Sequence, residues 1–233
     1  MSGLDGLIFD KDGTLFDFAA TWEAWAKAFL VRLAKGDRAR AAALGRVIEF
    51  DLESGTFAPT SLVIAGTAGE VAAALRPHVP EMAEIDLLTI LNEEAERAPQ
   101  QPAVPLVPLL TGLRARGLRL GVATNDAEGP ARAHLAEAGV TGLFDFIAGY
   151  DSGFGGKPAP GQLLAFADQI GADPARIAMI GDSTHDLRAG RAAGMTTVAV
   201  LTGLATEGTL APLADCVLPD IGHLPDWLDR RKG

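Results

Sequence analysis

Short apolar runs and amphipathic stretches divide this chain of 233 residues into three parts. Leu7-Ile8-Phe9 contains no polar residue, which predicts a strand buried within a parallel sheet. Residues 18–97 repeat apolar residues at helical spacing with no strand-like run between them, which predicts helices alone. From residue 106 onward, short apolar runs alternate with helical stretches, and this order predicts βαβ units.

The first predicted helix carries its largest side chains on one face. Trp22, Trp25 and Phe29 recur at spacings of three and four residues, the period of an α-helix. We interpret this aromatic stripe as a packing face and not as part of a cofactor site. Glycine and proline residues separate this helix from those that follow. The predicted helices of this part are residues 18–35, 39–52, 68–75 and 82–97.

Glycine and proline also mark the helix ends after residue 105. Gly117, Gly139 and Gly194 each follow a predicted helix, and Pro160 begins another. The predicted helices here are residues 106–116, 128–138, 160–171 and 186–193, and the predicted strands are residues 118–123, 144–148, 177–180, 196–201 and 216–218.

The order of these elements predicts an α/β fold with two domains. Residues 1–15 and 105–233 are expected to form a Rossmann-like core around a parallel sheet. Residues 16–104 are expected to form an inserted, all-helical cap domain, with a hinge at each junction.

Composition and charge narrow the functional class. A hydrophobic content of 48% supports a sizeable core, and the formal net charge of −10 argues against nucleic acid or an anionic membrane as a partner. Cys216 is the single cysteine, which excludes an intramolecular disulfide and fits a reducing compartment. No apolar run approaches the roughly 20 residues of a membrane span, and no signal-peptide pattern begins the chain. We expect a cytoplasmic protein, either monomer or homodimer.

Two carboxylates directly follow the first predicted strand. Asp10 and Asp12 lie at the carboxyl end of that strand, where open α/β sheets bind ligands. One carboxylate there can attack phosphorus and form an aspartyl-phosphate, while its neighbour carries a proton. Gly13 permits a sharp turn, and Thr14 offers a hydroxyl to the site or to the turn. A solvated Asp-Gly turn has the same local pattern, so the later strand ends decide between the two interpretations.

Two later strand ends add a hydroxyl and a cation. The hydroxyl of Thr124 and a backbone N–H near Asn125 are suited to hold phosphoryl oxygens, although a helix N-cap before Glu128 fits these residues equally well. Lys157 would set a positive charge against the phosphate and the nucleophile. Its glycine-rich surroundings are also typical of a flexible surface loop.

The fourth strand end supplies two more acids. Asp182 offers the kind of carboxylate that Mg²⁺ prefers. Asp186 begins the next predicted helix, where it could support the metal through water or pair with Lys157; the helix dipole alone also favours an acid there. His185 is expected to be a surface residue at the helix start. Two acids, a hydroxyl, a lysine and two more acids thus follow four predicted strands of the sheet in turn. Chance does not account for this order.

These residues together resemble the haloacid dehalogenase superfamily of phosphatases, and most closely its phosphoglycolate-phosphatase-like branch with a helical cap of the C1 type. The resemblance covers nearly the whole chain. Two acids in the first motif argue against the dehalogenases themselves, which lack the second acid. The four matching motifs are Asp10-x-Asp12-Gly13-Thr14, Thr124, Lys157 and Gly181-Asp182-x-x-x-Asp186.

The resemblance implies a role for each matching residue. Asp10 would be the nucleophile and Asp12 the general acid and base, with Thr124 and Lys157 binding the transferring phosphoryl group. Mg²⁺ would be held by Asp10, the backbone carbonyl of Asp12 and Asp182, with Asp186 supporting these ligands. Thr14 and Asn125 complete the expected substrate-binding residues.

The implied function is Mg²⁺-dependent hydrolysis of a small phosphorylated metabolite, with 2-phosphoglycolate as one candidate. A sugar-phosphate mutase of the same superfamily and a non-catalytic module that binds a phosphorylated ligand are the alternatives. A phosphonate hydrolase would need a cap lysine, and Lys27 and Lys35 instead suit a solvated helix face.

The cap loop at residues 53–59 is our candidate for the segment that determines substrate specificity, unless it is an ordinary connection between helices. Lys11 stands where the family usually has an apolar residue; its charge would point to solvent or to a cap acid, or add to the field at the phosphate.

Overall fold

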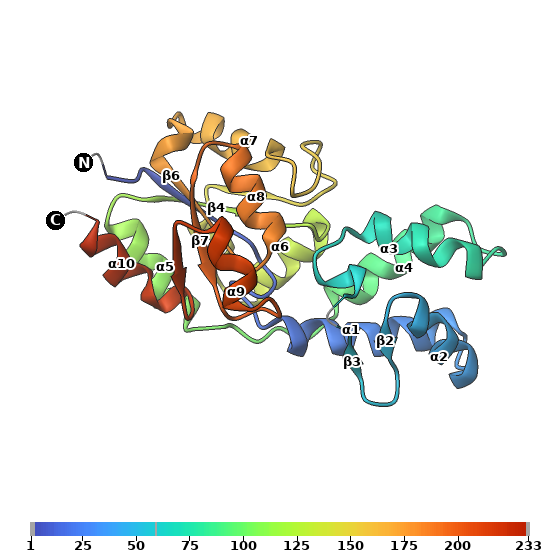
Figure 1. Ribbon diagram of the computed structural model, residues 1–233. Helices are drawn as coiled ribbons and strands as arrows, with labels where there is room; N and C mark the ends of the chain where they lie inside the picture. Colours follow the sequence, from blue (N-terminus) through green and yellow to red (C-terminus); the bar gives the residue numbers. More distant parts are fainter. Residues whose placement is uncertain (1–2, 59, 232–233) are drawn as a thin grey trace.

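The computed structural model describes residues 3–58 and 60–231, and a six-stranded parallel sheet forms the centre of its larger part (Figure 1). The strand order is β5-β4-β1-β6-β7-β8, so that β1 lies in the middle between β4 and β6. Because all strands are parallel, their carboxyl ends meet at one edge. The strands are β1 (Gly6–Phe9), β4 (Arg119–Ala123), β5 (Phe146–Ala148), β6 (Ile177–Gly181), β7 (Thr196–Val200) and β8 (Cys216–Leu218). The predicted α/β fold is therefore confirmed.

Helices cover both faces of the sheet because successive strand residues point to opposite sides. Leu7 and Phe9 belong to the hydrophobic cluster under α5, α6 and α10, whereas Ile8 belongs to the cluster under α7 and α8. Gly121 on β4 leaves room for the ring of Phe166 from α7. The helices are α5 (Leu106–Ala115), α6 (Glu128–Glu137), α7 (Gly161–Ile170), α8 (Thr184–Ala192), α9 (Glu207–Leu210) and α10 (Leu224–Arg230). Helices α9 and α10 were not predicted.

A smaller, mainly helical body lies beside the sheet (Figure 1) and has its own hydrophobic cluster. We call this body the cap. The rings of Trp25 and Phe29 stack with centroids 5.1 Å apart, and Trp25 Nε1 donates to the carbonyl of Leu91, which confirms the aromatic stripe as a packing face at these positions. The cap helices are α1 (Phe18–Leu33), α2 (Arg38–Val47), α3 (Ala68–Leu75) and α4 (Glu84–Glu96).

The cap also contains a small β-hairpin. The prediction of one helix over residues 39–52 is therefore wrong, and so is the prediction that the cap is all-helical. Helix α2 ends at Val47, and β2 (Phe50–Asp51) pairs antiparallel with β3 (Thr56–Phe57). The carboxylate of Asp51 accepts backbone N–H groups of the next turn, and the rings of the paired phenylalanines lie 4.7 Å apart. These local bonds compete successfully with the helix. Pro59 lies outside the described residues.

The two chain segments between the cap and the sheet run side by side. The backbone N–H of Asp17 donates to Gln101, and that of Ala103 donates to Leu15, at 2.8 and 2.9 Å. This pairing fits a pair of hinges, but the hinges and the domain boundaries at residues 15 and 105 stay predictions. Among the described residues, no helix combines the length and apolar character needed to cross a membrane.

Candidate active site

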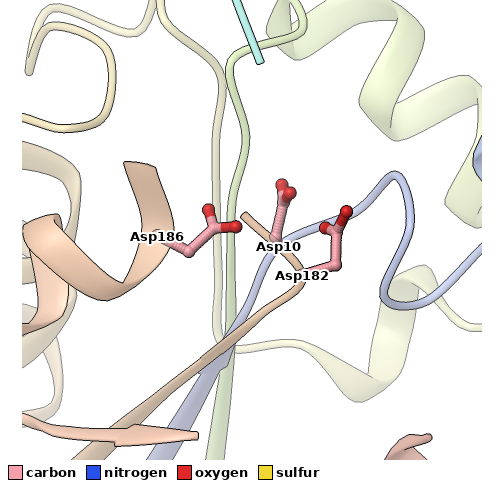
Figure 2. A group of neighbouring side chains, drawn as sticks. All are labelled: Asp10, Asp182 and Asp186. Carbon is pink, nitrogen blue, oxygen red and sulfur yellow. The ribbon is translucent and has the colours of Figure 1, made fainter. Parts of the chain in front are cut away.

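Three acids that follow two neighbouring strands meet at the carboxyl edge of the sheet (Figure 2). Asp10 follows β1, Asp182 follows β6, and Asp186 lies in the first turn of α8. The register of β1 against β6 places these strand ends beside each other. One oxygen from each carboxylate lies within 4.8 Å of the others, and all three side chains are buried.

Lys157 binds two of these acids. Its Nζ lies 2.7 Å from Asp10 Oδ1 and 2.6 Å from Asp186 Oδ1. Burial by itself would lower the pKa of Lys157, but the charges of Asp10 and Asp186 raise it above its ordinary value, so the amine is a cation at neutral pH. The predicted Lys157–Asp186 pair is therefore present.

The charges in this cluster favour a divalent cation. Burial raises the pKa of Asp10 to about 7, although Lys157 opposes that shift. Burial and the charges of Asp186 and Asp10 raise the pKa of Asp182 well above its ordinary value. Three carboxylates thus share one lysine in a poorly solvated place. Carboxylate oxygens are the ligands that Mg²⁺ prefers, so the donor set fits this ion.

Asp182 is held from behind by the turn that follows Asp12. The hydroxyl of Thr14 donates to Asp182 Oδ1 at 3.3 Å. A Cβ at Gly13 or at Gly203 would overlap the Asp182 carboxylate, so both glycines are needed for its position. The Thr14 hydroxyl therefore contacts Asp182, and the role of Thr14 in binding substrate stays a prediction.

One oxygen of Asp10 is available for reaction. Within the described chain, the hydrogen bonds and ion pairs of the Asp10 side chain involve Oδ1, which accepts from the Lys11 backbone N–H at 2.6 Å and from Lys157. Asp12 lies half-buried beside it, with Oδ1 2.7 Å from Lys11 Nζ. The cluster therefore offers a carboxylate oxygen without a partner next to a second acid.

The residues after β4 hold the loop that carries Lys157. The Thr124 hydroxyl accepts from the backbone N–H of Asp126 and can still donate its own proton. The side chain of Asn125 accepts from the Lys157 backbone N–H and donates to the carbonyls of Lys157 and Ala65. Residue Ala127 precedes α6 and makes no side-chain cap, so the N-cap alternative is wrong. The backbone N–H of Asn125 has no acceptor in the described ranges and is available to a phosphoryl oxygen.

Lys11 is fully buried, so the expectation that its charge points to solvent or to a cap acid is wrong. Its Nζ lies 2.7 Å from Asp12, 3.3 Å from Asp126 and 2.9 Å from His134 Nδ1. Burial opposes the charged form of Lys11, but Asp12 and Asp126 raise its pKa above the ordinary value. Lys11 therefore places a fixed cation directly beside the predicted acid–base residue.

His134 extends this network into the cap. Because Lys11 is the donor at Nδ1, the proton of His134 lies on Nε2, which donates to the carbonyl of Ala95 in α4 at 2.7 Å. Burial and the charge of Lys11 lower the pKa of His134 to about 4, so the ring is neutral at pH 7. Sequence reasoning missed Asp126 and His134; the available signal was their place at the strand end and on the first two turns of the following helix.

A cavity of about 640 Å³, counting its opening to solvent, lies between these residues and the cap. Residues 53–58 do not line it, so the prediction that this loop faces the substrate is wrong. Lys27 and Lys35 are exposed and do not line it either. His185 does lie at the helix start, as expected, but it is half-buried and lines the cavity. The lining from the sheet side includes Asp10, Asp12, Thr124, Asn125, Asp126, Lys157 and Asp186, and that from the cap includes Phe18, Trp22, Trp25, Val71, Leu91 and Asn92.

The sequence and this geometry can be compared with known proteins. Residues 4–194 match the profile of haloacid dehalogenase-like hydrolases. The chain belongs to this family. The resemblance inferred from the four motifs is thus confirmed.

Curated relatives of this haloacid dehalogenase-like hydrolase include several phosphatases. A phosphoglycolate phosphatase of Rhodospirillum rubrum is 39% identical over 51% of this chain and 49% of its own length. The probable phosphatase IndB of Dickeya dadantii is 37% identical over 46% of this chain and 47% of its own. A phosphoglycolate phosphatase of Xylella fastidiosa is 31% identical over 84% of this chain and 80% of its own length. The chain thus matches about half the length of the first two relatives and most of the third.

Solved structures share the fold over nearly the whole chain. A predicted phosphoglycolate phosphatase from Haemophilus somnus superposes with a TM-score of 0.74 at 18% identity, covering 97% of this chain and 98% of the other. The β-phosphoglucomutase of Clostridium difficile superposes with a TM-score of 0.66 at 16% identity, covering 98% of both. At these identities the likeness shows the fold of the haloacid dehalogenase-like hydrolases and leaves the reaction open.

Proposed function

We propose that this protein hydrolyses small phosphate monoesters through an aspartyl-phosphate on Asp10, with the help of Mg²⁺. The observation that carries the proposal is the arrangement of Asp10: its Oδ2 has no partner within the described residues, Asp182 lies beside it, and Asp10 and Lys157 both line the cavity. The names of the curated phosphatase relatives support the same reaction class.

In the first step, Asp10 Oδ2 attacks phosphorus, and the bond between phosphorus and the ester oxygen breaks. Asp12, whose carboxyl lies beside Asp10 at the cavity, gives a proton to the departing alcohol. In the second step, Asp12 takes a proton from water, whose oxygen attacks phosphorus and breaks its bond to Asp10. Inorganic phosphate leaves, and both carboxyl groups return to their starting state.

Three groups are placed to hold the phosphoryl oxygens. Lys157 supplies a fixed positive charge, the Thr124 hydroxyl has a free proton, and the backbone N–H of Asn125 faces no acceptor in the described chain. Donors that are held in place before the reaction stabilise charge that develops during phosphoryl transfer.

The side chains of Asp10 and Asp182 and the backbone carbonyl of Asp12 would hold Mg²⁺, while Asp186 positions Lys157. When bound, the ion would neutralise the charges of the nucleophile and the phosphate so that two anions can approach each other. The excess of buried carboxylates over cations supports this assignment.

Replacing Asp10 tests the proposal. Asp10→Asn should abolish phosphate release from a panel of esters that includes 2-phosphoglycolate, because an amide oxygen is a poor nucleophile. Asp168→Asn, on an exposed position of α7, is the matched control and should keep full activity. EDTA should silence the wild type, and Mg²⁺ should restore it. Phosphate release by Asp10→Asn at the wild-type rate would refute the assignment.

Product analysis separates hydrolysis from the mutase reaction. Free phosphate indicates a phosphatase, whereas an isomerised sugar phosphate indicates a mutase. We propose a small phosphorylated metabolite as the partner. A cytoplasmic location and the lack of nucleic-acid and membrane partners stay predictions from the sequence, as does a monomer or homodimer.

A further inference from the structure

The cap side of the cavity is a largely apolar wall. Trp22 and Trp25 come from α1, Val71 from α3 and Leu91 from α4, and Phe18 extends the wall toward the sheet. Three separate helices thus present aromatic and aliphatic side chains to the same space. A wall of this kind gains free energy by covering apolar surface of a ligand.

The cavity has no spare cation for a second acidic group. Among the lining residues of the described chain, Lys157 is the one lysine or arginine, and Asp10 and Asp186 already bind it. Asp12 and Asp126 add further negative charge to the lining. A carboxylate or a second phosphate on the substrate would therefore lose its water without gaining a cationic partner, which disfavours its binding.

The polar groups on the cap side are uncharged. Trp22 Nε1 is buried and has no hydrogen-bond partner in the part of the chain described, although Trp22 lines the cavity. Asn92, next to Leu91 on α4, lines the cavity, and its side chain makes no hydrogen bond within the same residues. These groups suit a neutral hydrogen-bonding atom on a ligand and bring no positive charge to balance an anion.

We propose that the substrate is a phosphate monoester of an uncharged, largely apolar alcohol, with its ring or branched chain held against Trp22 and Leu91. This inference rests on the proposed phosphatase function and names its substrate class. It makes Trp22 and Leu91 specificity-determining residues. It also makes 2-phosphoglycolate, which carries a carboxylate close to its phosphate, a poor substrate.

Two esters that differ by one charge test the inference. Benzyl phosphate should be hydrolysed with a kcat/KM at least about tenfold above that of 4-carboxybenzyl phosphate, since only the second places an unpaired charge against the apolar wall. Trp22→Ala should lower kcat/KM for benzyl phosphate by about tenfold or more, with a smaller effect on methyl phosphate, whose single methyl group covers little of the wall. Ile85→Ala, on an exposed position of α4, should change neither value.

Adding a cation to the wall should reverse the preference. Asn92→Arg should raise kcat/KM for 4-carboxybenzyl phosphate relative to benzyl phosphate, because the guanidinium gives the carboxylate a partner. Equal or better hydrolysis of the carboxylated ester and of 2-phosphoglycolate by the wild type, abolished by Asp10→Asn, would overturn the inference and leave the proposed function intact.

Binding separates the two proposals if no ester is hydrolysed. Such a result would refute the phosphatase function. Quenching of tryptophan fluorescence would then still measure affinity, because Trp22 and Trp25 line the cavity. Benzylphosphonate should bind at least about tenfold more tightly than 4-carboxybenzylphosphonate. Equal affinities would contradict the inference directly.

Discussion

A single buried cation, Lys11, joins the predicted acid–base residue to the cap. It lies between Asp12 and Asp126, and His134 carries the contact on to the carbonyl of Ala95. Lys11 therefore positions Asp12, and it does not itself line the cavity. The family pattern gave no hint of this role, because an apolar residue usually stands there.

Replacing Lys11 should cost both stability and activity. Lys11→Met leaves Asp12 and Asp126 without their cation, and breaking a buried ion pair in this way typically costs about 3–5 kcal/mol. Urea unfolding should show a loss of this order, and kcat should fall because Asp12 loses its position. Lys27→Met, exposed on α1, is the matched control. An unchanged unfolding free energy would contradict the buried network.

The neutral state of His134 should make stability depend on pH. Its folded-state pKa of about 4 lies below the ordinary value of 6.5, so between these values the unfolded chain binds more protons. The contribution of His134 is thus complete above pH 6.5 and is lost as the pH falls toward 4, by roughly 3 kcal/mol in total. His134→Gln should flatten this part of the profile.

Urea unfolding of both proteins at pH 7.5 and pH 5 measures the effect. Asp10 and Asp126, whose pKa values are raised, contribute to the unfolding free energy with the opposite pH dependence. Their contributions cancel when the unfolding free energy of His134→Gln is subtracted from that of the wild type. His223→Gln, at an exposed position, should follow the wild type. A parallel pH dependence in His134→Gln would show that this ring does not titrate as described.

Sequence reasoning found the candidate site residues that follow a strand directly or lie in the loop after it. Asp10, Lys157 and Asp182 could be predicted to meet because their chemistry is unusual and the strand order brings parallel ends together. The contacts of Lys11 and His134 could not, because they depend on how α6 packs against both β1 and the cap. A side chain's burial is a property of its neighbours, which a single sequence does not reveal.

Among the secondary-structure elements, the loop after β7 contributes more than was expected. The hydroxyl of Thr202 donates to the carbonyl of Gly13 at 2.6 Å, and Gly203 lies against the carboxylate of Asp182. This loop and the turn after Asp12 together enclose the predicted metal ligand. The strand itself was predicted, but no charged residue at its end drew attention to the loop.

Gly203→Ala should weaken metal binding while leaving the fold intact. The added Cβ overlaps the Asp182 carboxylate and must displace it, so the Mg²⁺ concentration for half-maximal activity should rise by about tenfold or more. Binding of Mn²⁺, followed by electron paramagnetic resonance, provides a readout without turnover. Gly142→Ala has open space around its Cβ and is the control. Unchanged metal affinity in Gly203→Ala would remove Asp182 from the metal site.

Helices and strands were predicted best where periodicity and end signals agree. Helix α3 matches its predicted bounds because Thr67 and Glu70 form a capping box, and β8 matches because its apolar run is short and complete. The predicted helix at residues 39–52 was too long, because the turn around Asp51 depends on local hydrogen bonds. Helices α9 and α10 are too short to show a period.

In the molecule as a whole, the two bodies divide the work of the site. The sheet edge supplies the charged groups, and the cap supplies an apolar wall, so the cavity between them combines phosphoryl chemistry with selection of the alcohol part. Asn125 and His134 tie the bodies together through the carbonyls of Ala65 and Ala95. The sequence predicted both bodies, but the chemistry of their shared cavity emerges only from the fold.

The most direct test of this account is to trap the phosphorylated enzyme. Rapid acid quenching after mixing with ³²P-labelled ester and Mg²⁺, followed by peptide mapping, should find the label on Asp10. With 4-nitrophenyl phosphate, whose phenolate leaves without a proton, Asp12→Asn should accumulate that species, because water is no longer activated to remove the phosphoryl group. If the wild type releases phosphate but Asp10 carries no label in the wild type or in Asp12→Asn, the central claim is contradicted.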